Sequence, residues 1–199
     1  MSKMNKKKLY KLIKESNYIK NNLVKNIHQI NRAIEIISNC ILNGGKVLLC
    51  GNGGSAADAQ HLAAEFLVRL KPSVKRNSIP AISLATDTST LTATGNDYSF
   101  NDIFSRPLSS LGYENDVLIV LSTSGNSKNI IKALKVAKKN KIQSISFLGN
   151  KGGMVKKFAD INLIISSKNT ARIQENHIFL GHIIFENVEQ ILIKKKYFK

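Results

Sequence analysis

Five short apolar runs alternate with stretches of helical spacing, and this alternation is the feature that most limits the folds open to the chain. Continuous apolar strands joined by helices indicate a parallel sheet that is covered on both faces. We predict an α/β fold in which a five-stranded parallel sheet is sandwiched by helices, with ligands at the carboxyl ends of the strands. The predicted strands lie at 46–50, 81–84, 116–121, 144–148 and 161–165, and the helices between them near 55–70, 98–111, 127–140 and 152–158.

Two longer helical patterns flank this alternating region. Apolar residues recur at helical spacing over 4–43, with a break expected near 21–26, and Asn43-Gly44-Gly45 has the chemistry of a helix C-cap. The second pattern runs over about 170–196. We predict an N-terminal helical arm over 1–44 that packs on a partner chain, and a domain over 45–199 that ends in a long C-terminal helix.

Charge and cysteine content limit the classes of partner. The net charge is +17, but the lysines are scattered or terminal and no aromatic-interleaved basic motif is present, which favours a solvated surface over nucleic-acid binding. A positive field would still attract an anionic substrate. No apolar run reaches the roughly 18 residues of a membrane helix, and Cys40 and Cys50 form no CxxC pair. We expect a cytoplasmic protein with reduced thiols and with neither nucleic-acid nor membrane partners.

The first predicted strand leads into the glycine-rich loop Gly51-Asn52-Gly53-Gly54-Ser55, which is followed by a helix. Glycines allow the backbone to approach a ligand closely, and Ser55 is expected to cap the helix, whose free N–H groups face any anion. The alternative is a tight turn that binds nothing. The loop is neither GxGxxG nor a Walker A motif, so by itself it is weak evidence of a site.

The third predicted strand leads into Ser122-Thr123-Ser124-Gly125-Asn126-Ser127 at the start of another helix. A phosphate group is bound well by many short donors at the positive end of a helix dipole, and this loop supplies both without a basic side chain. The alternative, an N-cap with a local turn, would need only one of the four hydroxyl groups. The number of hydroxyl groups therefore favours a phosphate site.

His61 and Glu65 are four residues apart on the helix after the glycine-rich loop, which places them on one face. They suit a metal pair or a base with its orienting partner, whereas an ordinary surface pair is the alternative. The last helix starts with the polar turn 172–177, which contains Gln174 and His177, and His182 follows. For either histidine taken alone, a packed core or surface position is the ordinary interpretation.

Six segments in this order resemble the phosphoheptose isomerases, which belong to the sugar isomerase (SIS) domain class, and the resemblance covers roughly residues 40–190. It implies interconversion of sedoheptulose 7-phosphate and D-glycero-D-manno-heptose 7-phosphate through an enediol, the first step toward nucleotide-activated heptose for surface polysaccharides. It also implies cytoplasmic homotetramers with active sites at subunit interfaces, some of which bind zinc. The segments are Cys50–Ser55, His61–Glu65, Gly95–Asp97, Phe100–Arg106, Leu121–Ser127 and Ala171–Glu175.

The resemblance also assigns residue roles, with Glu65 as the general base and His182 as the general acid. The implied ligands of one zinc per subunit are His61, Glu65, Gln174 and His182. The implied substrate contacts are Asn52, Gly53, Gly54, Ser55, Glu65, Asn96, Asp97, Ser122, Thr123, Ser124, Ser127 and Gln174. Two tensions follow: a carboxylate bound tightly to zinc is a poorer base, and Gln174 lies roughly 12 Å from His182 along a continuous helix. A bend in the helix or ligands from different subunits would relieve the second.

Two other functions fit the same fold. A non-catalytic SIS-fold tetramer could bind the replication initiator DnaA, but a binding module does not need the full set of His61, Glu65, Gln174 and His182. A different SIS isomerase or a sugar-phosphate-binding regulator is the second alternative. Regulators usually add a DNA-binding domain, and only about 45 residues precede the first predicted strand here.

Overall fold

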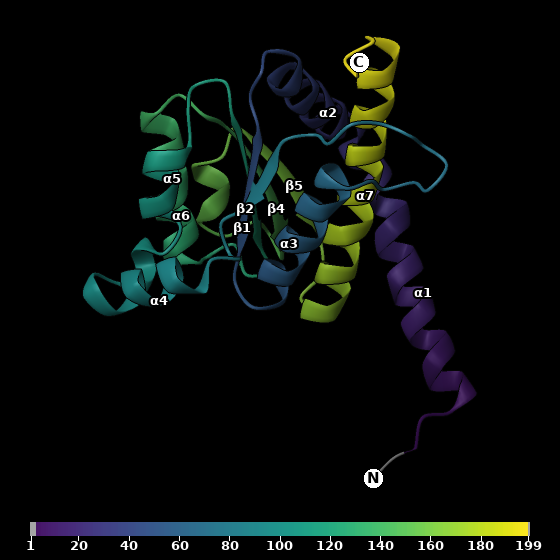
Figure 1. Ribbon diagram of the computed structural model, residues 1–199. Helices are drawn as coiled ribbons and strands as arrows, with labels where there is room; N and C mark the ends of the chain where they lie inside the picture. Colours follow the sequence, from purple (N-terminus) through teal and green to yellow (C-terminus); the bar gives the residue numbers. More distant parts are fainter. Residues whose placement is uncertain (1–2, 199) are drawn as a thin grey trace.

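Five strands form one parallel sheet, as the alternating pattern predicts, and the structure places them in the order β2-β1-β3-β4-β5 (Figure 1). The computed structural model describes residues 3–198. Every residue of β1 and β3 is buried, because helices cover both faces of the sheet at its centre. The strands are β1 (Val47–Gly51), β2 (Ala81–Ser83), β3 (Val117–Ser122), β4 (Gln143–Gly149) and β5 (Ile161–Ile165).

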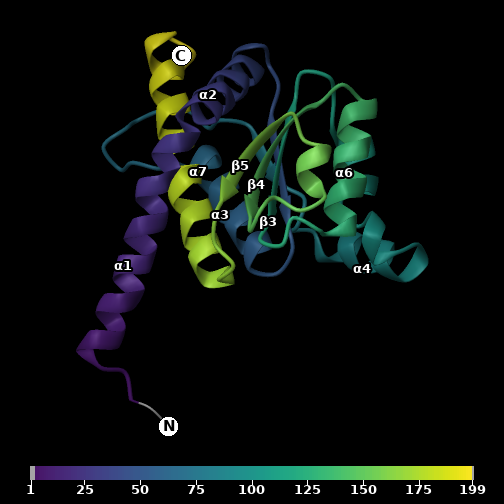
Figure 2. The same ribbon diagram turned by 180° about the vertical axis from the view of Figure 1, so that it is seen from behind.

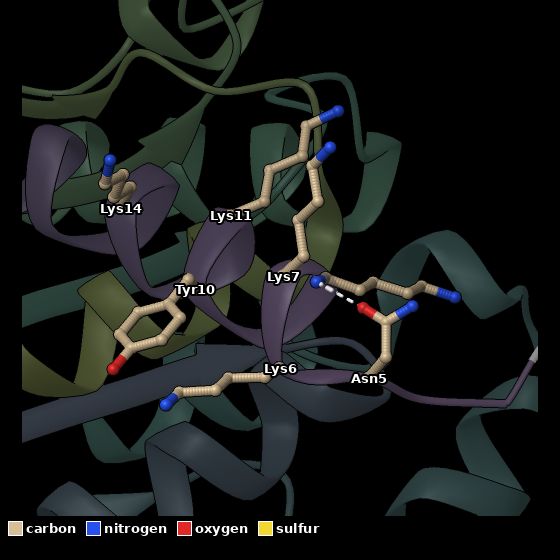
Figure 3. A pocket seen from close by; sticks show the side chains of 7 residues that line it. Asn5, Lys6, Lys7, Tyr10, Lys11 and Lys14 are labelled. Atoms are coloured by element: carbon tan, nitrogen blue, oxygen red, sulfur yellow. Dashed lines mark hydrogen bonds between the residues drawn. The ribbon is translucent and has the colours of Figure 1, made fainter.

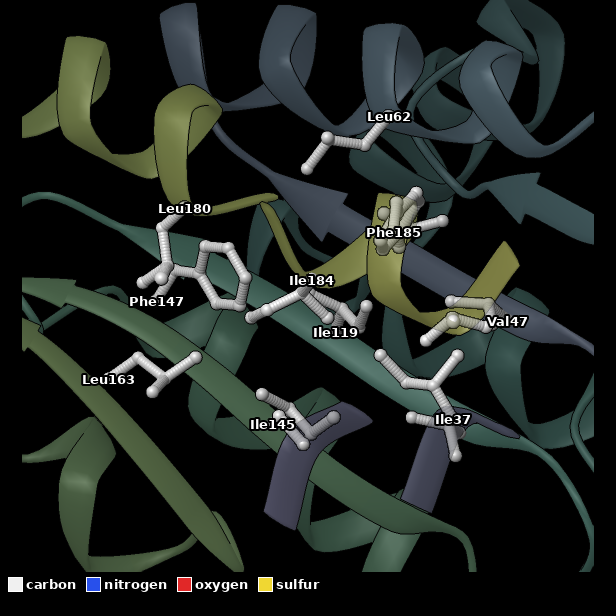
Figure 4. Packing of buried hydrophobic residues seen from close by; sticks show 14 of the residues in the cluster. Ile37, Val47, Leu62, Ile119, Ile145, Phe147, Leu163, Leu180, Ile184 and Phe185 are labelled. Atoms are coloured by element: carbon white, nitrogen blue, oxygen red, sulfur yellow. The ribbon is translucent and has the colours of Figure 1, made fainter. Parts of the chain in front are cut away.

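Helices form a layer on each face of this sheet (Figures 1 and 2). One layer contains α2 (Ile27–Leu42), α3 (Gly54–Leu67) and α7 (Thr170–Lys194), whose apolar residues share a core with alternate strand residues such as Val47, Ile119 and Phe147 (Figure 4). The other layer contains α5 (Ser105–Leu111) and α6 (Lys128–Lys139), which pack on the opposite-facing residues Leu48, Leu118 and Val120. Alternate residues of each strand therefore serve two separate hydrophobic cores.

The N-terminal helical pattern is confirmed, including its break. α1 (Lys6–Asn22) is followed by a 3-10 turn over Leu23–Asn26, and then by α2. α1 extends away from the sheet in both ribbon views and buries only Ile19, whereas α2 packs into the core (Figures 1 and 2). A surface hollow at the start of α1 is lined only by residues of the segment 5–14, and none of them is a predicted site residue (Figure 3). Packing of an arm on a partner chain stays a prediction.

Two of the predicted helices were wrong in detail. The segment 98–111 is not one helix: α4 (Thr88–Asp97) and a 3-10 turn at Phe100–Asp102 precede α5, with Ser99 in extended conformation between them. Asp87 starts α4, since its Oδ1 accepts from the backbone N–H of Thr90 at 3.2 Å. The segment 152–158 contains only a 3-10 turn at Val155–Lys157. Gly152 and Gly153 have φ of +84° and +53°, which a right-handed helix does not contain.

The structure also tests two expectations, that the thiols are reduced and that no helix spans a membrane. Cys40 and Cys50 are buried and form no disulfide, and burial raises the pKa of both thiols, that of Cys40 to about 12. Among residues 3–198, no helix combines the length and the apolar character that a bilayer crossing requires.

The buried face of α7 carries a histidine as well as the predicted apolar residues. His177 is 0% exposed, and within residues 3–198 neither ring nitrogen makes a hydrogen bond of normal geometry, although the backbone of Leu148 lies close enough to oppose the pKa shift. Its ring lies at the edge of Phe147 with the centroids 6.0 Å apart. Burial lowers the pKa of His177 from 6.5 to about 4, because the charged form loses its hydration. His177 is therefore neutral in the folded protein at neutral pH.

We expect acid to destabilise the fold through His177. Between pH 6.5 and 4 the unfolded chain binds a proton that the folded chain excludes, so the free energy of unfolding falls as the pH falls. From pH 7 to pH 5 this contribution is about 2 kcal/mol. Urea unfolding at the two pH values should show that His177→Leu loses less stability than the wild type by about this amount. Equal losses in the two proteins would mean that His177 does not carry this effect.

Candidate active site

Three side chains from two helices converge where α3 packs on α7. His61 and Glu65 lie one turn apart on α3, and His182 comes from α7. The Nε2 atom of His61 lies 2.8 Å from Nε2 of His182 and 3.2 Å from Oε1 of Glu65. One donor atom from each of the three residues lies within 4.8 Å of the other two. A carboxylate and two imidazoles from a single chain therefore face one small volume.

Close packing of α3 on α7 holds these groups together. Gly181 precedes His182, and a Cβ atom at this position would lie 2.6 Å from a terminal methyl group of buried Leu62, the neighbour of His61. One turn further, the rings of Phe66 and Phe185 stack with centroids 3.8 Å apart. The absence of a side chain at Gly181 thus lets the two helices approach closely enough for their histidines to touch.

The donor set of this cluster fits a metal ion. Around a zinc ion with bonds of roughly 2.0–2.1 Å, tetrahedral ligands lie about 3.3 Å apart, and zinc prefers imidazole nitrogen and carboxylate oxygen donors. The observed separations of 2.8 and 3.2 Å are close to that value. The side chain of His61 is 47% exposed and that of Glu65 is 17% exposed, so a further ligand could reach the cluster from solvent.

Burial and charge set the protonation of the groups around the cluster. Burial lowers the pKa of His182, nearby His61 lowers it further, and Glu65 opposes both effects. A neutral imidazole is the form that binds a metal or donates a single proton. Asp58 lies one turn before His61 on α3, and burial raises the pKa of its carboxyl group to about 6. One oxygen of Asp58 is buried and finds no hydrogen-bond partner among residues 3–198.

Gln174 occupies a different part of α7. The helix is continuous over Thr170–Lys194, so the bend that would bring Gln174 beside His182 is absent, and the two residues are separated by about 12 Å along the axis. The amide of Gln174 instead lies against Gly54, where a Cβ atom would be 2.2 Å from Nε2. Gln174 therefore borders the glycine-rich loop.

We expect Gly54→Ala to displace Gln174 without unfolding the protein. The added methyl group would meet the movable end of a side chain, and alanine at a helical position is favourable, so stability should stay within about 1 kcal/mol of the wild type. If the amide contacts the substrate, kcat/KM should fall by about fivefold or more, since a polar group left without its partner costs about 1–3 kcal/mol. Gln174→Ala should cause a similar loss, and the double variant little more. If the losses of the two single variants added up in the double variant, Gly54→Ala would not act through Gln174.

The loop after β3 keeps several hydroxyl groups near one helix end. Ser122 Oγ accepts from the backbone N–H of Gly125 at 3.1 Å and lies 3.2 Å from Ser127 Oγ. Ser127 occupies the N-cap position of α6 but makes no side-chain capping bond. Thr123 is half-buried, and Ser124 is exposed with its hydroxyl bonded to the N–H of Asn126. Local turns use the hydroxyl groups of Ser122 and Ser124, but no side chain caps α6 at Ser127, which leaves the helix N-terminus available to an anion.

A pair of amide hydrogen bonds joins the glycine-rich loop to the first turn of α6, directly after the hydroxyl-rich loop. Asn52 and Asn129 donate to each other at 3.0 and 2.8 Å, and Asn129 also accepts from the N–H of Ile130. The contact arises because β1 and β3 are neighbours in the sheet. Sequence analysis missed Asn129, whose only signal was its place in the first turn of the helix. The expected cap by Ser55 was wrong: Gly53, with φ of +56°, is the N-cap of α3, and Ser55 is buried.

Asn96 and Asp97 lie near the end of α4. Both are exposed, and the side-chain amide of Asn96 donates to Asp97 at 2.8 Å. Within residues 3–198, no hydrogen bond joins either of them to His61, Glu65 or His182. The single chain thus presents this pair to solvent, outside the cluster.

The chain is similar to known proteins over nearly its whole length. The SIS domain family matches residues 13–149. A phosphoheptose isomerase of Clostridium acetobutylicum is 48% identical over 94% of this chain and 90% of its own length. The solved structure of the phosphoheptose isomerase of Neisseria gonorrhoeae is 40% identical with a TM-score of 0.86, covering 92% of this chain and 98% of that one. That of Francisella tularensis is 35% identical with a TM-score of 0.88, covering 94% and 100%.

Proposed function

The chain belongs to the SIS domain family and, within it, to the phosphoheptose isomerases, and from this premise we propose that it interconverts sedoheptulose 7-phosphate and D-glycero-D-manno-heptose 7-phosphate. The observation that carries the proposal is the convergence of Glu65 and His182 in one small volume. The reaction is the first step toward nucleotide-activated heptose. The alternative of a protein that binds DnaA has no support from these relatives, each of which bears the name of the isomerase.

Glu65 and His182 divide the proton transfers between them. Aldose–ketose isomerisation moves a proton between adjacent carbons through an enediol. The carboxylate of Glu65 removes the carbon-bound proton, and His182 donates a proton to the carbonyl oxygen. The donor atoms of the two side chains lie within 4.8 Å, a span that one sugar carbon and its neighbouring oxygen can bridge.

His61, Glu65 and His182 would also hold one zinc ion per subunit. When bound, the metal supplies polarisation of the carbonyl group and stabilises negative charge on the enediolate. Because a carboxylate that binds metal tightly is a weaker base, we give the proton transfer by Glu65 precedence over its metal binding. Gln174 as a fourth ligand remains part of the proposal, although it lies beside Gly54 in the single chain.

The two joined loops would bind the substrate. The phosphate would lie at the N-terminus of α6, on the hydroxyl groups of Ser122, Thr123, Ser124 and Ser127. Asn52, Gly53, Gly54, Ser55 and Gln174 would contact the sugar. Exposed apolar residues of α1, Leu9, Tyr10 and Ile13, support burial of this helix in a homotetramer. In that cytoplasmic tetramer, Asn96 and Asp97 would reach a substrate at a subunit interface.

Turnover of sedoheptulose 7-phosphate tests this function directly. Protein purified without chelator, with its metal content measured, is incubated with the ketose with and without added zinc, and aldose formation is followed by NMR. We expect aldose to accumulate to an equilibrium mixture, with unchanged ketose in a boiled-protein control. No turnover under either condition, together with tight DnaA binding, would reject the enzyme in favour of the binding protein.

A further inference from the structure

We propose that Arg76, in the segment between α3 and β2, is a positioning residue that fixes the general base relative to the general acid. The inference rests on the proposed isomerase function and concerns how its centre is held. The guanidinium group of Arg76 makes no hydrogen bond to the side chains of His61, Glu65 or His182. It acts on the backbone of α3 and on a buried side chain of α7.

The first half of this device holds the end of α3. Nη2 of Arg76 donates to the backbone carbonyl of Glu65 itself at 2.8 Å, and Nη1 donates to the carbonyl of Phe66 at 2.9 Å. α3 ends at Leu67, so these are carbonyls of its last turn, where intrahelical donors run out and the helix dipole is negative. A guanidinium group therefore caps the helix at the residue that supplies the base.

The second half ties this cap to α7. Nε of Arg76 donates to a carboxylate oxygen of Glu189, which lies two turns beyond His182 on the same helix. The Arg76 and Glu189 side chains are 1% and 3% exposed. The guanidinium group of Arg76 thus links the backbone of Glu65, the proposed base, to α7, the helix that carries His182.

The desolvation cost of the buried Arg76–Glu189 pair argues that the pair does more than stabilise the contact between the two segments. Burying a guanidinium and a carboxylate costs desolvation energy that their attraction only partly returns, so an apolar pair often stabilises equally well. The partly exposed ion pair of Lys71 with Glu186 already links the same segment to α7. What the buried pair adds is a fixed bonding geometry between Glu65 and α7, because a guanidinium group presents its donors in a rigid fork.

Steady-state kinetics of two single variants and one control variant test this role. Arg76→Lys keeps the positive charge but cannot donate to the carbonyls of Glu65 and Phe66 at the same time. Glu189→Gln keeps both hydrogen bonds to these carbonyls but removes the negative charge on α7 that pairs with Arg76. Each should lower kcat about 10- to 100-fold, because displacement by about 1 Å is enough to cost this much. KM should change less than about threefold, since Arg76 makes no contact with loop 122–127. Lys71→Gln, which breaks the partly exposed ion pair with Glu186, is the matched control and should keep kcat within about twofold.

The double variant Arg76→Met/Glu189→Leu separates positioning from folding. Apolar replacement of a buried pair should preserve the folded state, as judged by circular dichroism and melting temperature, yet kcat should remain at least about tenfold reduced. A folded double variant with wild-type kcat would overturn the proposal, as would folded single variants with wild-type kcat.

A second measurement does not depend on turnover. The affinity of each variant for Zn²⁺, measured by competition with a chromophoric chelator, should fall at least about tenfold if α3 and α7 lose their alignment. If the wild type failed to convert sedoheptulose 7-phosphate, the proposed function would fall, and the affinity comparison would still decide the role of Arg76. Unchanged affinity in the folded double variant would count against that role.

Discussion

Replacement of Glu65 by glutamine should abolish turnover of sedoheptulose 7-phosphate while leaving the fold and the oligomer intact. The amide has the size of the carboxylate but cannot accept the carbon-bound proton, and losing a general base costs about 10²–10⁴-fold in rate. We expect kcat to fall at the upper end of this range, about 10³-fold or more. Among residues 3–198, Glu65 is the only carboxylate in the cluster with His61 and His182.

The measurement is kcat from the NMR assay, with size-exclusion chromatography to verify assembly. Glu35→Gln, the same chemical change on the exposed side of α2, is the matched control and should leave kcat unchanged. If Glu65→Gln retained a rate near that of the wild type, Glu65 would not be the base, and the proton transfer would have to be assigned to another group.

Gly181→Val should separate α3 from α7 and impair both stability and catalysis. Its side chain would collide with the buried methyl groups of Leu62, and overpacking of this kind costs about 1–3 kcal/mol of unfolding free energy. Because His61 and His182 adjoin the two colliding residues, we also expect kcat to fall about 100-fold. Valine is a better helix former than glycine, so the losses would not arise from the backbone of α7.

A compensating substitution distinguishes collision from other causes. Leu62→Ala leaves space for the new valine, so the double variant should be more stable than the sum of the two single changes predicts, and should recover part of kcat. Urea unfolding and the NMR assay measure both effects. Strictly additive losses would mean that Gly181 acts through something other than the approach of the two helices.

The fold was largely predictable because the central strands β1 and β3 are nearly continuous apolar runs and the other strands are short, mostly apolar segments between helical patterns, and all five predicted strands are confirmed. The missed element, α4, is rich in threonine and serine and buries only Thr94, so it lacks the apolar periodicity that identifies a helix. The error at 152–158 came from the two left-handed glycines, which end regular structure. Local pattern sufficed wherever an element has a buried face.

The site was predictable only where its residues are neighbours in sequence. The spacing of His61 and Glu65 indicated a shared helix face, whereas His182, which lies 121 positions from its contact His61, was assigned through the family resemblance. Asn129 and Arg76 were missed because their partners, Asn52 and Glu189, lie 77 and 113 positions away. Contacts at such separations depend on strand order and helix packing, which no local pattern specifies.

The contact between α3 and α7 also has a consequence for biosynthesis. α3 follows the first strand, whereas α7 follows the last, so the reacting groups are made early and late in translation. A nascent chain whose strands have paired on the ribosome would still lack His182 beside Glu65. Glu65 and His182 would then come together in a single step, when α7 emerges and docks on α3.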